Sequence, residues 1–227
     1  MSAKYAPKGA FGQAIHTAEE TVIAVILGLM TVLTFTNVVL RYVFNHSIIW
    51  GLEATLVLFA WLVIFGISYA VKVTAHLGVD AVIGALPSRG QRVLAVLSAL
   101  ACLIYAVLML KGAYDYWAPF AGLNQTTGRV FPTGIDANTR DRAFYMTEQI
   151  PFPAFLSFLE DAVNQGDTYD KLPRFIPYVM LPFGMALFLL RLVQASIEIW
   201  RGERSALIVS HEAEDAIDDV RHLNKED

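Results

Sequence analysis

The sequence predicts an all-α integral membrane protein with four transmembrane helices and additional short interfacial helices. Of its 227 residues, 56% are hydrophobic and 17% are charged, whereas soluble domains average about 45–50% apolar and about 25% charged residues. The charges are unevenly placed: four runs carry none, and charged residues stand at the ends of these runs. Lipid is the solvent in which such runs are stable as helices.

The four uncharged runs have lengths suited to crossing a bilayer. They are 20, 18, 18 and 16 residues long and cover 21–40, 54–71, 93–110 and 175–190. A helix needs about 20 apolar residues to cross the hydrocarbon core, with a range of about 17–25. The fourth run reaches this length if Arg191 extends toward the headgroups and the helix continues beyond it. Pro182 lies inside this run and should kink the helix, because proline donates no backbone hydrogen bond.

The spans divide the chain into five parts. We expect an interfacial helix in the loop 72–92, although a buried re-entrant turn also fits its small and apolar residues. The connection that follows the third span is too polar to lie in lipid, and its stretch 151–166 predicts an amphipathic helix with Phe155, Leu159 and Val163 as an apolar stripe. The parts are a cytoplasmic N-terminal segment at 1–20, three spans at 21–118, a periplasmic insertion at 119–174, a fourth span at 175–200 and an acidic cytoplasmic tail at 201–227.

The orientation follows from the basic residues. Four spans place both termini on one side of the membrane, and short cytoplasmic loops are enriched in lysine and arginine. Arg41 is the one basic residue in the short loop on the opposite side. The face shared by the termini carries eight, namely Lys4, Lys8, Lys72, Arg89, Arg92, Arg191, Arg201 and Arg204. We therefore expect cytoplasmic termini, and an uncleaved first span, which is too long for a signal-peptide core.

Several classes of function lack the residues they require. The net charge is −4, so there is no basic surface for nucleic acid. No phosphate-binding glycine loop or dinucleotide fingerprint occurs in the sequence. The five histidines all lie outside the apolar runs, which disfavours a haem held between spans. We expect no cofactor, no metal site and no enzymatic activity.

The polar and small residues near the spans suggest packing between helices. Thr34, Asn37 and Arg41 recur on one face of the first span, and we favour helix packing over a transport role for this face. Gly66 and Ala70 form a small-residue pair in the second span that allows close helix approach. Arg41 and Glu53 lie on the same side of the membrane, so they could pair and staple two helix ends or contact a partner; we favour the staple.

Two stretches resemble a known family, the small membrane subunit of tripartite ATP-independent periplasmic (TRAP) transporters of the C4-dicarboxylate type. They read LRYVFNHSIIWGLE and FAWLVIFGISYAVKVTAHLGVDAVIGALP. The sequence departs from the family pattern at Leu52, where a first acidic residue is expected, and in its long connection 111–174. The positions that match the pattern, and that we take as candidate scaffold or partner contacts, are Arg41, Trp50, Glu53, Gly66, Lys72, His76 and Asp80.

The resemblance implies an accessory role in the bacterial inner membrane. In this family a large membrane subunit carries the substrate and sodium sites and moves by an elevator-like mechanism, while a soluble periplasmic protein captures the substrate. The small subunit, surrounded by membrane lipid, stabilises the large one. Two alternatives stay open at this point: a membrane anchor of a redox complex, and a small carrier that works alone.

Overall fold

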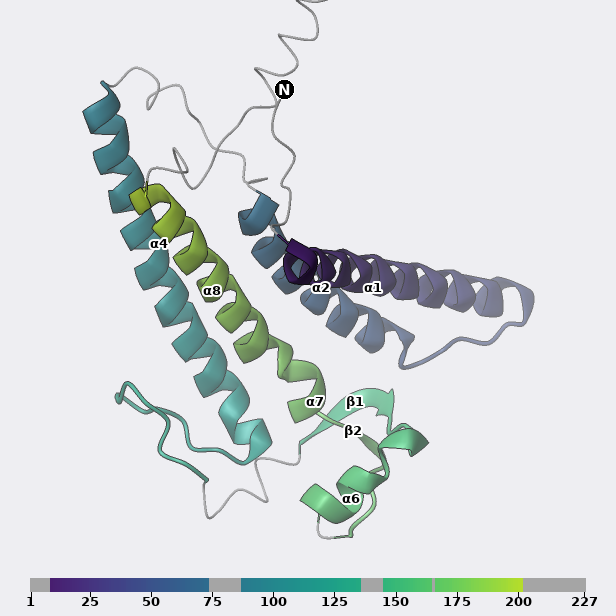
Figure 1. Cartoon of the computed structure of the whole chain (residues 1–227). Helices are drawn as coiled ribbons and strands as arrows, with labels where there is room; N and C mark the ends of the chain where they lie inside the picture. The colour runs from purple at the N-terminus through teal and green to yellow at the C-terminus, as the bar shows by residue number, and fades with distance from the viewer. Residues whose placement is uncertain (1–8, 74–86, 136–144, 165, 202–227) are drawn as a thin grey trace, which may run out of the picture. The chain divides into compact units, whose positions relative to one another are not determined.

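The computed structural model describes residues 9–73, 87–135, 145–164 and 166–201 (Figure 1). Within these ranges, four helical segments are long and apolar enough to cross a membrane. They are formed by α1 (Gly9–Val43), α2 (Gly51–Val73), α4 (Ser88–Trp117) and the consecutive helices α7 (Phe175–Tyr178) and α8 (Met180–Arg201). The predicted all-α membrane fold is confirmed.

The helices extend beyond the predicted runs at several ends. The first helix starts at Gly9 and runs without interruption into the apolar segment, so no separate interfacial helix precedes it in the described chain. The fourth continues past Arg191 to Arg201, as its apolar length required. Of the loop predicted at 72–92, residues 74–86 lie outside the described part of the chain, and α4 already begins at Ser88.

The fourth span is interrupted at Val179, between α7 and α8. The position follows from Pro182, which has no N–H group to donate to the carbonyl of Tyr178 four residues earlier. The backbone bonds on either side persist, from Val179 N–H to the Phe175 carbonyl at 3.2 Å and from Phe183 N–H to the Val179 carbonyl at 3.1 Å. The proline thus interrupts the helix one turn before its own position.

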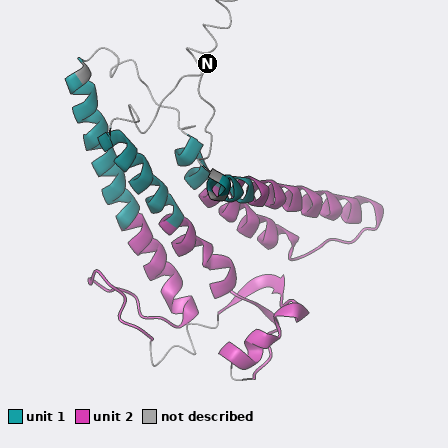
Figure 2. Cartoon of the chain, viewed as in Figure 1, with its two compact units in different colours: residues 1–19, 66–107, 187–227 teal, residues 20–65, 108–186 magenta. Residues whose placement is uncertain are grey.

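The chain divides into two compact units, shown in different colours in Figure 2. Unit 1 contains 1–19, 66–107 and 187–227, and unit 2 contains 20–65 and 108–186. The core of unit 1 joins the end of α2 to α4 and α8 through small and aliphatic side chains. Its buried members are Val71, Ala95, Ala99, Ala106, Leu192, Ala195 and Ile199. Alanines at such a contact allow close helix packing without a large cavity.

In unit 2 the end of α4 is held to the start of α7. The indole N–H of Trp117 donates to the Phe175 carbonyl at 2.9 Å. The rings of Tyr116, Phe120 and Tyr178 pack together, with Phe120 and Tyr178 edge to face at 5.3 Å between centroids. Edge-to-face packing matches the positive edge of one ring to the negative face of another. These contacts hold together the two ends of the segment that connects the third span to the fourth.

That segment contains a small sheet that the sequence does not predict. Strand β1 (Met146–Pro151) pairs antiparallel with β2 (Lys171–Pro173). Met146 pairs with Pro173, and Pro151 pairs with Lys171. The two paired positions are five residues apart in β1 but only two apart in β2, so β1 forms a bulge between them. The bulge frees the backbone amides in the middle of β1 from the ladder.

The amphipathic helix predicted at 151–166 is shorter than expected. It consists of a 3-10 turn, η2 (Ala154–Leu156), followed by α6 (Phe158–Val163). Phe155 lies in the turn and is 78% exposed, so the expected apolar stripe is not continuous. The helix ends near Gly166, whose φ of +86° is readily adopted only by glycine.

The phenol of Tyr169, three residues after Gly166, stays neutral. Burial and the Glu160 carboxylate raise the pKa of Tyr169 to about 12.

Candidate functional site

A buried charged cluster joins three helices within unit 1. Glu19 on α1 accepts hydrogen bonds from Lys72 on α2, at 2.5 Å, and from Arg191 on α8. The three side chains are 13%, 3% and 11% exposed respectively. One turn before Glu19 and Lys72, the rings of His16 and Tyr69 stack in parallel at 5.8 Å. We call Glu19, Lys72 and Arg191 the Glu19 cluster.

The Glu19 cluster occurs where charge is tolerated in a membrane protein. It lies near the start of the first apolar run and at the ends of the second and fourth, so these three ends meet. A charge near low dielectric is stable only if it is paired and hydrogen-bonded. Lys72, a predicted border contact, is therefore a buried helix-joining residue.

The second polar centre lies in unit 2, at the first turn of α2. The Glu53 carboxylate accepts the backbone N–H groups of Glu148, Gln149 and Ile150, at 3.0, 2.6 and 3.2 Å. These three residues lie between the paired ends of β1, where the register with β2 shifts. Converging amides of this kind form a favourable site for an anion. Glu53 thus holds the segment between α4 and α7 against the start of α2.

The expected ion pair between Arg41 and Glu53 is wrong. Both residues lie in the described part of the chain, and Glu53 is bonded to the β1 amides instead, while Arg41 is exposed in the last turn of α1. The physical reason is that two sets of partners compete for the Glu53 carboxylate. Hydrogen bonds from three amides of a fixed backbone do not require a second long side chain to be held in place. An exposed ion pair with Arg41 would require it and would contribute only about 0–1 kcal/mol.

The polar face of the first span serves local packing. The Asn37 side-chain oxygen accepts the backbone N–H of Ile48 at 2.9 Å and so fixes the connection between α1 and α2. Trp50 follows in the same connection and is 37% exposed. Asn37 thus has a structural role in this connection, and helix packing by the rest of the face stays a prediction.

The glycines of the spans differ in whether another helix lies close to them. A Cβ atom placed on Gly66 would meet no heavy atom of the described chain within 4 Å. Gly184 on α8 is the opposite case, because its Cβ would fall 2.0 Å from Ile64 Cγ2 on α2. The sequence pattern favours Gly66 as a packing residue and does not single out Gly184. Among the glycines compared in the described part of the chain, Gly184 lies against a neighbouring helix and Gly66 does not.

A pocket of about 360 Å³, whose wall is mostly apolar, extends from this close approach to Glu53. Beside it, the Trp61 indole N–H donates to the Pro177 carbonyl at 2.8 Å. The polar lining residues are Glu53, Tyr116, Thr147 and Tyr178. Such a wall suits an apolar side chain or an acyl chain.

The remaining candidates, His76 and Asp80, lie outside the described residues. Two members of the Glu19 cluster, Glu19 and Arg191, were not among the candidates predicted from the sequence. The available signal was the placement of an acid at the start of the first run and an arginine inside the fourth helix, since such charges need partners in lipid.

Glu53→Gln should release the β1 bulge selectively. An amide oxygen carries no net charge, so the charge-assisted part of the three bonds is lost, and bonds to charged groups contribute about 1.5–3 kcal/mol. We expect the amides of 148–150 to exchange hydrogen about 10–100 times faster, measured by mass spectrometry on the purified chain. Asp161→Asn removes an equal charge from an exposed side chain outside β1 and serves as the control. Equal exchange in both variants would contradict the role given to Glu53.

Four segments of the described chain that are long and apolar enough to cross a membrane, three of them joined by buried charges at one set of ends, define a multi-pass membrane protein. Residues 30–134 match the family described as tripartite ATP-independent periplasmic transporters, DctQ component. The chain belongs to this family of TRAP transporter small permease proteins.

Two relatives are each named C4-dicarboxylate TRAP transporter small permease protein DctQ. The one from Vibrio cholerae is 41% identical over 210 residues, which cover 92% of this chain and 83% of the relative. The one from Pseudomonas aeruginosa is 27% identical over 231 residues, covering 90% and 92%. A putative TRAP transporter small permease protein from Haemophilus influenzae is 35% identical over 118 residues, covering 49% of this chain and 73% of that protein. These relatives give no support to the redox-anchor alternative.

Proposed function

We propose that this protein is the scaffold subunit of a sodium-coupled TRAP transporter for C4-dicarboxylates. It stabilises a large, moving membrane subunit, and a periplasmic binding protein delivers the substrate. The observation that carries the proposal is the open small-residue faces of the spans. A Cβ atom placed on Gly28 of α1 or on Gly66 of α2 would meet no described atom within 4 Å, and small residues in lipid-exposed faces favour close approach of another helix.

The candidate contacts fall into two kinds under this proposal. Arg41, Trp50 and Gly66 remain available to the large subunit. Glu53 and Lys72 act indirectly, because they hold the chain's own elements in place. For His76 and Asp80 the family pattern alone supports a contact role.

Deleting the gene should abolish uptake that depends on sodium and on the binding protein. The large subunit would lack its scaffold, while substrate capture by the periplasmic protein should be unchanged. Radiolabelled dicarboxylate uptake in cells checks the first expectation and calorimetry on the binding protein checks the second. The purified small subunit should release no heat with substrate. Saturable binding to it, or normal uptake in the deletion strain with the large subunit at normal abundance, contradicts the scaffold function.

We further propose that the protein lies in the bacterial inner membrane with both termini in the cytoplasm. The support is the excess of basic residues on the face shared by the termini. In a Cys102→Ser background, cysteines at Asn124 and Asn164 should react with an impermeant thiol reagent in intact cells. A cysteine at Ser210 should react only after lysis. The reverse pattern would overturn the orientation.

A further inference from the structure

Residues 123–135 form a short hairpin, the 123–135 hairpin, which follows the end of α4 in unit 2. Leu123 and Ile135 form a β-bridge at its base, and the Asn124 N–H donates to the Gly134 carbonyl at 2.9 Å. Thr127 and Gly128, with φ of 39° and 80°, turn the chain at its tip. The hairpin is thus a defined structure with a base and a tip.

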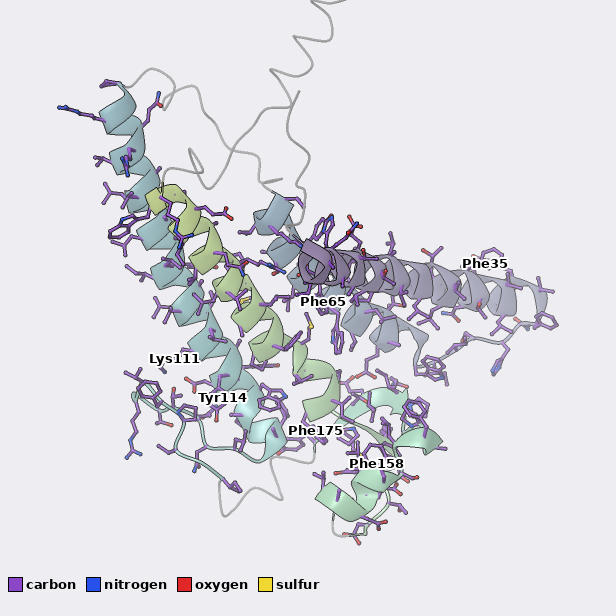
Figure 3. All side chains as sticks on the ribbon, viewed as in Figure 1. Phe35, Phe65, Lys111, Tyr114, Phe158 and Phe175 are labelled. Carbon is purple, nitrogen blue, oxygen red and sulfur yellow. The ribbon has the colours of Figure 1, made fainter. Side chains whose placement is uncertain are left out.

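A polar network around the buried Thr126 attaches this hairpin to the side of α4. The Asp115 carboxylate accepts the Thr126 backbone N–H at 2.6 Å, and the Lys111 ammonium donates to the Thr126 hydroxyl at 2.6 Å and to Asp115 at 3.0 Å. Thr126 is only 3% exposed. The Tyr114 hydroxyl donates to the Asn124 carbonyl at 3.3 Å. Figure 3 labels Lys111 and Tyr114 where the hairpin lies against the helix.

These contacts set the direction of the hairpin. From its base near the end of α4, the chain folds back, so that Thr126 lies level with Lys111 and Asp115. The uncharged run of the third span ends at Leu110, and its 18 residues correspond to about 27 Å of helix, close to the hydrocarbon thickness of about 30 Å. Lys111 therefore marks the edge of the hydrocarbon, and the hairpin tip points toward it.

The tip presents apolar side chains at this depth. Val130 and Phe131, just after the turn, are 78% and 77% exposed. Leu108, one helical turn before Lys111, is also exposed and lies inside the apolar run. The exposed apolar side chains of the tip therefore stand in the part of the hairpin that Thr126 holds beside the end of the apolar run. Arg129 precedes these two residues in the chain and is also exposed.

We infer that the 123–135 hairpin is an interfacial membrane wedge. Val130 and Phe131 enter the boundary between acyl chains and headgroups, and the Arg129 guanidinium binds a lipid phosphate. Apolar side chains next to a basic one are the combination that interfacial segments use. The network around Asp115 holds the wedge ready, so no ordering is needed when lipid contacts it. This inference concerns lipid alone and stands independently of the scaffold function.

Spin labels can measure the depth of the wedge. In the full chain with Cys102→Ser, labels at Phe131→Cys and Ile135→Cys would be compared in vesicles of phosphatidylethanolamine and phosphatidylglycerol. Ile135 is the matched control, because it is similarly exposed but lies at the hairpin base. We expect at least a threefold higher ratio of oxygen to water-soluble nickel chelate collisions at position 131 than at 135.

Two further variants test the parts of the wedge. Asp115→Asn should reduce the difference between positions 131 and 135, because the attachment of Thr126 is weakened. Arg129→Gln should reduce it more in vesicles with phosphatidylglycerol than in neutral ones. Equal collision ratios at 131 and 135 in the parent chain would overturn the inference. So would protection of position 131 from both reagents that develops only when the large subunit is added, since a protein would then cover the tip.

Discussion

Glu19→Gln should cause a large loss of stability, larger than that of an exposed charge change in the described part of the chain. The Glu19 carboxylate is shared by Lys72 and Arg191, and all three side chains are largely buried. Neutralising it removes the carboxylate that the Lys72 ammonium and the Arg191 guanidinium share. Breaking a buried ion pair by removing one partner typically costs about 3–5 kcal/mol. We expect a strongly lowered thermal midpoint and reduced yield of folded protein in mild detergent.

Asp161→Asn is the matched control, because it removes the same charge from an exposed position on α6. Exposed substitutions away from special features usually stay within about 0.5 kcal/mol. Glu19→Asp should recover part of the stability, since it keeps the charge on a shorter side chain. A thermal midpoint for Glu19→Gln equal to that of Asp161→Asn would mean that the cluster contributes nothing to the fold.

The spans were predictable because one physical constraint fixes them. A backbone in lipid must satisfy its own hydrogen bonds, so apolar runs of sufficient length become helices. The same reasoning located the interruption of the fourth span near Pro182, although the break occurs at Val179. The displacement has a physical cause, since the carbonyl that loses its donor lies four residues before the proline.

Pairing between distant residues was not predictable from the sequence. Glu19 and Arg191 are separated by 172 positions, and no local pattern indicates that α1 and α8 meet there. Strands β1 and β2 read MTEQIP and KLP, without the alternation of apolar and polar residues that signals a strand. Their pairing depends on where α4 ends and α7 begins, which only the tertiary structure sets.

The error over Glu53 has the same origin. The sequence suggests Arg41 as its partner, because Arg41 is the nearest opposite charge across a short loop. The true partners are neutral backbone amides 95 to 97 positions away. A search for opposite charges cannot find such partners, because every residue except proline carries an N–H group.

Gly184→Ala should destabilise the folded chain, because α2 and α8 approach each other closely there. The new Cβ would lie 2.0 Å from Ile64 Cγ2 and 3.0 Å from Met180 Cε. Ile64 is buried and branched at Cβ, so it has little freedom to move aside. Overpacking of this kind costs about 1–3 kcal/mol. The thermal midpoint in detergent should fall, and Ile64→Ala in the same chain should reverse part of the loss specific to Gly184→Ala.

Gly66→Ala is the matched substitution at an open position and should separate folding from assembly. Its Cβ meets no described atom within 4 Å, and alanine favours helix by up to about 1 kcal/mol over glycine. The isolated subunit should therefore keep or gain stability. If Gly66 lies against the large subunit, as we propose, copurification of the two subunits should fall while the midpoint does not. A larger change, Gly66→Leu, should reduce copurification of the two subunits further without lowering the thermal midpoint of the isolated subunit. Unaltered copurification with Gly66→Leu would remove Gly66 from the partner surface, and a midpoint for Gly184→Ala equal to that of Gly66→Ala would contradict the close approach of α2 and α8.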